Sequence, residues 1–275
     1  MNKLILVCLL CLCPVQALAW ERTMTCEPPN CGDKTPLPTY WEDPCVAFHL
    51  NKAGTRKMNF ADVQKIVKIS VDAWYHPDIS SLTPHLSGLT DEDRVGYNPY
   101  IDQNANIIVF RDDEWTEAGE MMALTTVTHR NSTGRIYDAD IEINTANWDY
   151  GIVEKDGKNV VDLQNTLTHE IGHVFGLAHS QNLEATMFPY SSTGETNLRS
   201  LEDDDLEAIA AIYPPSGNAC VFRDGTFQKP PYDMDEAPVK DEDCSSQPRT
   251  PHTTPLWLFI VAMGMLLRRR TASFL

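Results

Sequence analysis

The segment THEIGHVFGLAHS, which runs from Thr168 to Ser180, gathers three histidines and one glutamate. His169 and His173 are four residues apart, so on a helix they lie one turn apart on the same face and can bind one metal ion together. His179 follows six residues later, too far along to reach that ion from a continuous helix. Gly176 resolves this, because glycine tolerates the left-handed conformation that ends a helix and turns the chain back.

Three nitrogen ligands leave one coordination position open, which is typical of a catalytic rather than a structural zinc site. Zinc lowers the pKa of its bound water toward about 7 and polarises a substrate carbonyl. Glu170, beside the first histidine, is placed to accept the proton of that water as general base. The motif HExxHxxGxxH thus predicts a zinc-dependent peptide hydrolase with His169, His173 and His179 as metal ligands and Glu170 as the catalytic residue.

The extended motif resembles that of the metzincin clan of zinc endopeptidases. Met187, in EATMFPY, stands where that clan places the methionine turn beneath the metal. Further residues resemble the matrixins, the family of the matrix metalloproteinases: Ser180 directly after the third histidine, Pro189 two residues after Met187, and DDDLEAIAAIYP at 203–214. The resemblance covers roughly Pro44 to Pro214.

The resemblance implies an α/β (α+β) catalytic domain, a twisted, mainly parallel five-stranded sheet with about three helices and a zinc cleft. Phe188, Pro189 and Tyr190 would help wall the pocket for the residue that follows the cut bond. The antiparallel edge strand near Leu124–His129 would pair with an extended substrate as one more strand. We expect no second, structural zinc, because the segment 129–144 offers only one histidine.

Residue patterns predict the elements of one domain over residues 38–214. Strands are expected at 46–50, 106–110, 124–129 and 136–144 from alternating or continuous apolar residues. Asn59 is expected to cap one helix and Asp162 the helix that carries the histidines. A closing helix is expected to begin at Ser200, with Ser200 and Asp203 forming a capping box, and to end at Pro214. Five isolated histidines are expected in loops or on the surface: His49, His76, His85, His129 and His252.

The first nineteen residues are typical of a signal peptide. A lysine precedes the apolar run Leu4–Leu12, which is too short to cross a bilayer, and Ala17-Leu18-Ala19 predicts cleavage before Trp20. We therefore expect a secreted or cell-surface protein on the extracellular side, where disulfides form.

Five cysteines follow the predicted signal peptide, beginning in a short segment at 20–37. We expect disulfides between Cys26 and Cys31 and between Cys45 and Cys220, although four cysteines allow three pairings. The stretch PPNCGDK also faintly resembles the matrixin propeptide motif, whose cysteine occupies the open position of the zinc. Cys31 is therefore either an inhibitory ligand or a disulfide partner, and an oxidising compartment favours the disulfide.

The C-terminal part divides into an acidic Pro/Ser/Thr-rich spacer at 215–255 and an apolar segment with an arginine cluster at 256–275. The apolar run would be about 18 Å long as a helix, shorter than a membrane span. This order, with Cys244 in the spacer, resembles the C-terminal sorting tails of myxobacterial surface proteins and implies a bacterial source. The alternatives are a tail that is cut during export, with an anchor at Cys244, or a retained single-pass membrane anchor.

A formal charge of −17 argues against nucleic acid as a partner, because phosphate binding needs clustered lysine and arginine. Calcium is possible, with Asp138 and Asp140 as candidate ligands, but acidic surface more often serves solubility and such residues more often accept backbone amides. Protein or peptide substrates are the expected partners, and nothing requires more than a monomer. The alternative functions are a weakly catalytic peptide-binding module and a hydrolase of small amides.

Overall fold

The computed structural model describes residues 19–100, 104–117, 121–215, 239–244 and 247–248, the last two stretches as backbone. The expected N-terminal run and apolar tail lie outside these residues. Within the part that the structure describes, helices are too short or too polar to cross a bilayer.

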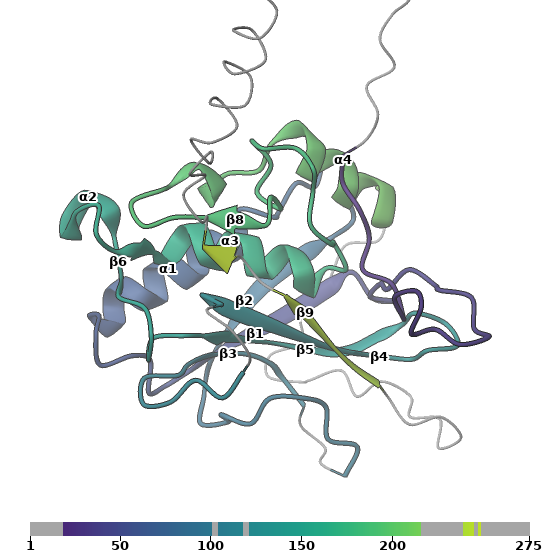
Figure 1. Ribbon diagram of the computed structural model, residues 1–275, viewed down its shortest axis with the longest axis horizontal. Coiled ribbons are helices and arrows are strands. Elements are labelled where there is room, and N and C mark those ends of the chain that lie inside the picture. Colours follow the sequence, from purple (N-terminus) through teal and green to yellow (C-terminus); the bar gives the residue numbers. More distant parts are fainter. Residues whose placement is uncertain (1–18, 101–103, 118–120, 216–238, 245–246, 249–275) are drawn as a thin grey trace, which may run out of the picture.

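The centre of the fold is the expected five-stranded, mainly parallel sheet (Figure 1). Its strands are β1 (Cys45–Asn51), β2 (Thr83–Thr90), β3 (Asn106–Phe110), β4 (Ala123–His129) and β5 (Ile136–Ile143). They lie in the order β2-β1-β3-β5-β4, and β4 is antiparallel to its neighbour β5 whereas the other pairs are parallel. A sixth strand, β9 (Val239–Cys244), pairs with the outer edge of β4 and was not expected.

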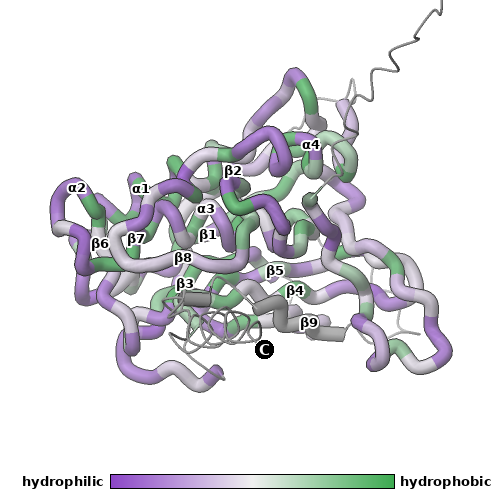
Figure 2. The backbone as a smooth tube through the Cα atoms, turned by 45° about the horizontal axis from the view of Figure 1, so that its top comes forward, coloured by the Kyte–Doolittle hydropathy of each residue, from purple (hydrophilic) through white to green (hydrophobic). Residues whose placement is uncertain are grey.

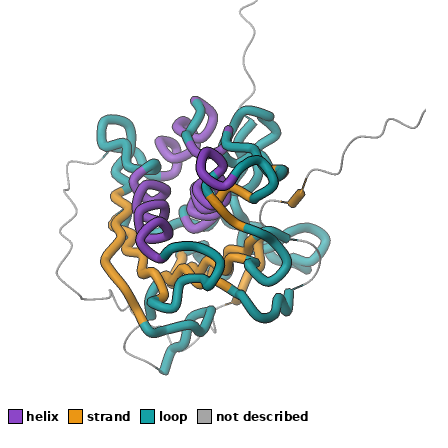
Figure 3. The backbone as a smooth tube through the Cα atoms, turned by 90° about the vertical axis from the view of Figure 1, so that its left-hand side faces the viewer, coloured by secondary structure: helices purple, strands orange, loops and turns teal. Residues whose placement is uncertain are grey.

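Helices cover one face of the sheet, as Figure 3 shows. They are α1 (Phe60–Asp72), the short α2 (Val153–Asp156), α3 (Leu163–Val174), the 3-10 helix η1 (Asn197–Arg199) and α4 (Asp203–Ile212). Four short strands make local pairs: β6 (Tyr150–Gly151) with β7 (Val161–Asp162), and β8 (Tyr190–Ser191) with β10 (Gln247–Pro248). Helix α3 contacts both α1 and strand β4, so the histidine motif lies on a helix that packs against that side of the sheet.

Two of the predicted helix starts are confirmed and one is wrong. Asn59 accepts a hydrogen bond from the amide of Ala61, and Asp162 accepts one from the amide of Asn165. The closing helix begins at Asp203 rather than Ser200, with Glu202 as its N-cap and a capping box between Glu202 and Asp205. The backbone at Ser200 is extended, and its carbonyl accepts a hydrogen bond from a threonine hydroxyl of the loop after α3.

The core lies between the sheet and helices α1 and α3. Phe175, at the end of α3, packs edge-on against Phe48 of β1 and Trp74 just after α1, at centroid distances of 6.0 and 5.7 Å. The Trp74 indole N–H donates to the carbonyl of Thr168, which joins the end of α1 to the middle of α3. Figure 2 shows apolar stretches along these inner elements and hydrophilic stretches in the outer loops.

The structure corrects two further expectations. Strand β2 was not predicted because TPHLSGLT contains a proline and a glycine, which an edge strand tolerates. His129 lies in β4 and is fully buried, and His49 is half-buried in β1, so neither is a surface or loop residue. The burial of each histidine follows from its position in a strand of the central sheet.

Candidate metal centre and active site

Helix α3 and the turn after it bring the three predicted histidine ligands together. His169 and His173 come from consecutive turns of α3 and are buried. The helix ends at Val174, and Gly176 follows with φ of +84°. A Cβ at this position would lie 2.7 Å from the carbonyl oxygen of Thr39, so both the dihedral and the close approach require glycine. The turn returns His179 to the helix, and the ligand atoms of the three histidines lie within 4.8 Å of one another.

Backbone carbonyls orient two of the imidazoles. Nδ1 of His169 lies 2.7 Å from the carbonyl oxygen of Thr186, and Nδ1 of His173 lies 2.8 Å from that of Leu177. A carbonyl can only accept, so each Nδ1 carries the proton and each Nε2 presents its lone pair. Both Nε2 atoms are buried without a hydrogen-bond partner among the described residues. Unsatisfied buried nitrogens are costly, and a metal ion at their point of convergence removes that cost.

The electrostatics of these histidines also suit a metal. Burial lowers the pKa of His173 to about 4. Burial and the neighbouring histidines lower the pKa of His169 well below its usual value. Both rings are therefore neutral near pH 7, which is the state that binds metal. Three nitrogen ligands with an open position fit a catalytic zinc.

Glu170 is held beside this cluster by strand β4. Its side chain is buried on α3, and Oε2 accepts a 2.7 Å hydrogen bond from the hydroxyl of Thr125 on β4. The same hydroxyl lies 3.1 Å from the Glu170 carbonyl oxygen. The sequence pattern does not reveal the role of Thr125, because contact between β4 and α3 follows from the packing of the helix on the sheet.

Met187 packs against α3 between the two helical histidines. It is 1% exposed, and a Cβ on Gly172 would lie 2.2 Å from its sulfur and 2.8 Å from the Trp74 ring. Gly172 is therefore required for the close packing of α3, the Met187 side chain and the Trp74 ring. The HExxH motif allows any residue at Gly172. The predicted methionine turn was the one sequence feature that indicated close packing of Met187 against this position.

Two acidic residues of α4 brace the loop that carries Met187. Asp205 accepts hydrogen bonds from the amides of Thr186 and Met187, at 2.8 and 3.1 Å. Asp204 accepts one from the hydroxyl of Ser180, at 2.6 Å, and the Ser180 amide donates to the Met187 carbonyl. Because the Thr186 carbonyl orients His169, Asp205 supports the metal site through the loop. In the sequence, the run of three aspartates at 203–205 was the feature that could have indicated these hydrogen bonds.

The predicted pocket-wall residues follow Met187 directly. Phe188 and Pro189 are half-buried and Tyr190 is 42% exposed. The Phe188 and Tyr190 rings pack edge-on at 5.8 Å. Tyr190 begins β8, and the next residue, Ser191, accepts a hydrogen bond from the side-chain amide of Asn165 on α3. The wall segment is thus tied to the same helix that carries the histidines.

Cys26 and Cys31 form a disulfide in the structure, with their Cα atoms 5.2 Å apart. In this state Cys31 has no thiolate with which to bind metal. Cys45 is also disulfide-bonded. Its predicted pairing with Cys220 remains a prediction.

Asp140 binds backbone amides. Its two oxygens accept hydrogen bonds from the amides of Gly96 and Ile107, at 2.6 and 2.9 Å. Burial raises its pKa to about 6, although these hydrogen bonds oppose the shift. Among the described side chains, the three histidines are the group whose ligand atoms converge for a metal, so Asp138 and Asp140 do not form such a group there.

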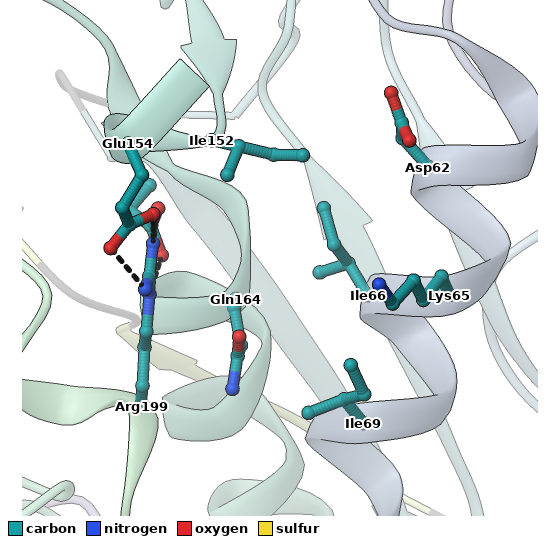
Figure 4. A pocket seen from close by; sticks show the side chains of 9 residues that line it. Asp62, Lys65, Ile66, Ile69, Ile152, Glu154, Gln164 and Arg199 are labelled. Carbon is teal, nitrogen blue, oxygen red and sulfur yellow. Dashed lines mark hydrogen bonds and ion pairs between the residues drawn. The ribbon is translucent and has the colours of Figure 1, made fainter. Parts of the chain in front are cut away.

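A separate pocket of about 240 Å³ lies between α1 and the start of α3 (Figure 4). Four of its charged groups pair with residues of the domain: Arg199 with Glu154 and Asp162, and Asp62 with Lys155. None of the three histidines lines it. The histidine cluster, rather than this pocket, therefore carries the functional assignment.

Comparison with known proteins agrees with the geometry. Residues 90–214 match the family model described as Matrixin. The chain is 35% identical over 111 residues to Metalloendoproteinase 5-MMP of Arabidopsis thaliana, an alignment that covers 39% of this chain and 29% of that protein. It is 43% identical over 58 residues to Interstitial collagenase of Sus scrofa, covering 21% of this chain and 12% of the relative. Stromelysin-2 of Rattus norvegicus is 38% identical over 88 residues, covering 30% and 17%.

The chain thus spans less than a third of the length of these relatives. The matched region contains the histidine cluster, Glu170 and Met187. Matrixins are zinc-dependent, in keeping with the three convergent nitrogens. The family match and the metalloproteinase relatives together show that residues 90–214 are similar to the metalloprotease domain of matrixins.

Proposed function

We propose that this protein is a secreted or surface-displayed, zinc-dependent endopeptidase that hydrolyses peptide bonds in extended segments of proteins. The observation that carries the proposal is the convergence of three histidine ligand atoms within 4.8 Å, next to a buried glutamate on the same helix. The similarity to matrixins supports the same reaction class.

His169, His173 and His179 would hold the zinc ion. Bound there, zinc supplies a positive charge that polarises the substrate carbonyl and acidifies water. The Thr186 and Leu177 carbonyls keep two of the imidazoles in the tautomer that binds metal. Met187 and Gly172 pack against each other beneath these ligands and limit their movement.

Glu170 moves the proton. Its carboxylate accepts a proton from the attacking water and then donates it to the departing amine. The Thr125 hydroxyl fixes the orientation of the carboxylate through Oε2. A buried carboxylate has few alternative positions, so it is pre-organised for the transfer.

The substrate would lie extended along the edge of the sheet. Backbone groups of β4 would pair with it, and Phe188, Pro189 and Tyr190 would contact the side chain that follows the cut bond. We further propose export by residues 1–19, cleavage before Trp20, and surface sorting or anchoring through residues 256–275. A binding-only module remains the second candidate, but it has no need of a carboxylate held beside the metal ligands by Thr125.

The decisive experiment measures cleavage of denatured casein by the full exported chain with and without a zinc chelator, alongside Glu170→Ala. Glu184→Ala, an exposed glutamate, is the matched control. We expect cleavage by the wild type and the control, and none after chelation or in Glu170→Ala, while Glu170→Ala still binds one zinc per chain. A zinc-loaded wild type that cleaves nothing would favour the binding module.

A further inference from the structure

The C-terminal part of the chain pairs with two strands that are hydrogen-bonded to the histidine-bearing helix α3. Strand β9 runs antiparallel along β4, from Val239 opposite His129 to Cys244 opposite Leu124. Strand β10 then runs parallel to β8, with Gln247 opposite Tyr190 and Pro248 opposite Ser191. Figure 1 draws these two strands in yellow, β9 beside β4 and β10 beside β8.

These two contacts are the ones proposed above for a peptide substrate. Asp243 of β9 is opposite Thr125, whose hydroxyl holds Glu170. Tyr190, opposite Gln247, belongs to the proposed pocket wall, and the next residue is bonded to α3 at Asn165. Cys244 and Gln247 are three residues apart, so at most about 11 Å of extended chain joins the two strands. The two strands therefore cover segments that are hydrogen-bonded to α3 at Glu170 and at Asn165.

We propose that β9 and β10 together are an intramolecular competitor of peptide substrates, a built-in segment that must leave the edge of β4 before a substrate can bind. This inference rests on the proposed function, because it assumes that substrates pair with β4. It assigns a regulatory role to the spacer that follows the catalytic domain.

The composition of β9 fits a displaceable occupant. Its sequence, VKDEDC, contains a lysine and three acidic residues, and these types are depleted in strands. A permanent strand of the core is expected to be apolar, as NIIVF of β3 is. The attachment is therefore weak per residue, but tethering gives the segment an effective concentration of order millimolar for a flexible linker. Tethering makes a weak occupant effective, while leaving it replaceable by a substrate that binds well.

The size of the effect follows from the occupied fraction. If the segment covers β4 in about nine of ten molecules, the apparent Kd of a competing peptide rises about tenfold, because it is divided by the open fraction. Disrupting the pairing should remove that factor and leave the intrinsic affinity unchanged.

The test uses the full chain with Glu170→Ala, so that substrate and tail are not cleaved during the measurement. Lys240→Pro/Asp241→Pro is added to disrupt β9, because proline removes backbone donors, and adjacent positions cover both alternations of the ladder. The control is Asp233→Pro/Met234→Pro, which precedes the strand and is outside the described residues. Fluorescein-labelled denatured casein is titrated against each zinc-loaded chain by fluorescence anisotropy.

Amide hydrogen exchange is measured on the same three chains without casein. We expect faster exchange in β4 (Ala123–His129) for the strand variant alone, with unchanged exchange in β3 (Asn106–Phe110) as evidence of an intact fold. We also expect casein to bind the strand variant about tenfold more tightly than the parent or the control.

The outcomes separate the two proposals. Equal exchange in β4 for all three chains overturns the competitor, whatever casein does. Faster exchange with equal casein affinity also overturns it, because the segment then covers an edge that substrates do not use. A third outcome is that casein binds none of the three chains, although exchange in β4 is faster in the strand variant. This result places the segment on β4 but refutes the peptide-binding cleft and the inference that depends on it.

Discussion

Thr125 Oγ1 donates a 2.7 Å hydrogen bond to Oε2 of Glu170, which joins strand β4 of the sheet directly to the helix that carries His169 and His173. The strand proposed to bind substrate is therefore joined by this hydrogen bond to the group proposed to move the proton. Both are buried, so the hydrogen bond is shielded from competing water.

Replacing Thr125 by valine keeps the shape of the side chain and removes the donor. A hydrogen bond to a charged group contributes about 1.5–3 kcal/mol, so we expect kcat to fall by roughly 10- to 100-fold with little change in KM. Steady-state peptide cleavage by zinc-loaded protein measures this. Thr125→Ser restores a hydroxyl and should recover most of the activity, and an equal loss in both variants would contradict the positioning role.

Gly172→Ala tests the close packing of Met187 against α3. The added Cβ would meet the Met187 sulfur at 2.2 Å, so we expect a loss of roughly 1–3 kcal/mol in the free energy of unfolding, together with weaker zinc binding. Urea unfolding and zinc titration measure the two effects. At Gly157 a Cβ would meet nothing within 4 Å, but the φ of +90° strains alanine there, so Gly157→Ala should lower stability while leaving zinc affinity unchanged. Wild-type zinc affinity in Gly172→Ala would show that this packing does not support the site.

Asp205→Ala tests the brace beneath the methionine turn. It leaves the amides of Thr186 and Met187 without their acceptor, and the Thr186 carbonyl then holds His169 less firmly. Loss of such outer support typically lowers metal affinity by about 10- to 100-fold. Competition with a calibrated zinc chelator measures the change. Glu207→Ala, an exposed position on the same helix, should behave as wild type; matching affinities in the two variants would argue against the brace.

The raised pKa of Asp140 predicts that the free energy of unfolding depends on pH. Its pKa is about 6 in the folded chain because burial disfavours the carboxylate, compared with 3.8 for the ordinary group. The folded state therefore takes up a proton before the unfolded state as pH falls. The stability from this group is fully present below about 3.8 and is lost as pH rises through about 6.

The measurement compares wild type with Asp140→Asn in urea at pH 7.5 and 4.5. We expect the wild type to gain on the order of 2 kcal/mol relative to the variant on acidification. Both chains carry the same metal site, so the difference cancels the effect of zinc release. A difference that stays constant with pH would show that burial does not raise the pKa of Asp140.

Local patterns were enough to predict the elements nearest the site. Asn59 and Asp162 cap the helices that they were expected to cap, and the strands at 106–110 and 124–129 are present. These features depend on neighbours within a few residues along the chain. The closing helix was misplaced because its start depends on the Asp205 carboxylate, which also binds the distant methionine turn.

By itself, the sequence determined which histidines come together, because the spacing of two histidines on one helix and the glycine that ends it act locally. Only the tertiary structure decided which groups support that set. Thr125, Gly172 and Asp205 reach the site from another strand, a helix face and a later helix, and such contacts depend on how the layers pack. The pairing of β9 with β4 likewise depends on an open sheet edge, which a polar, acidic segment does not reveal in its own sequence.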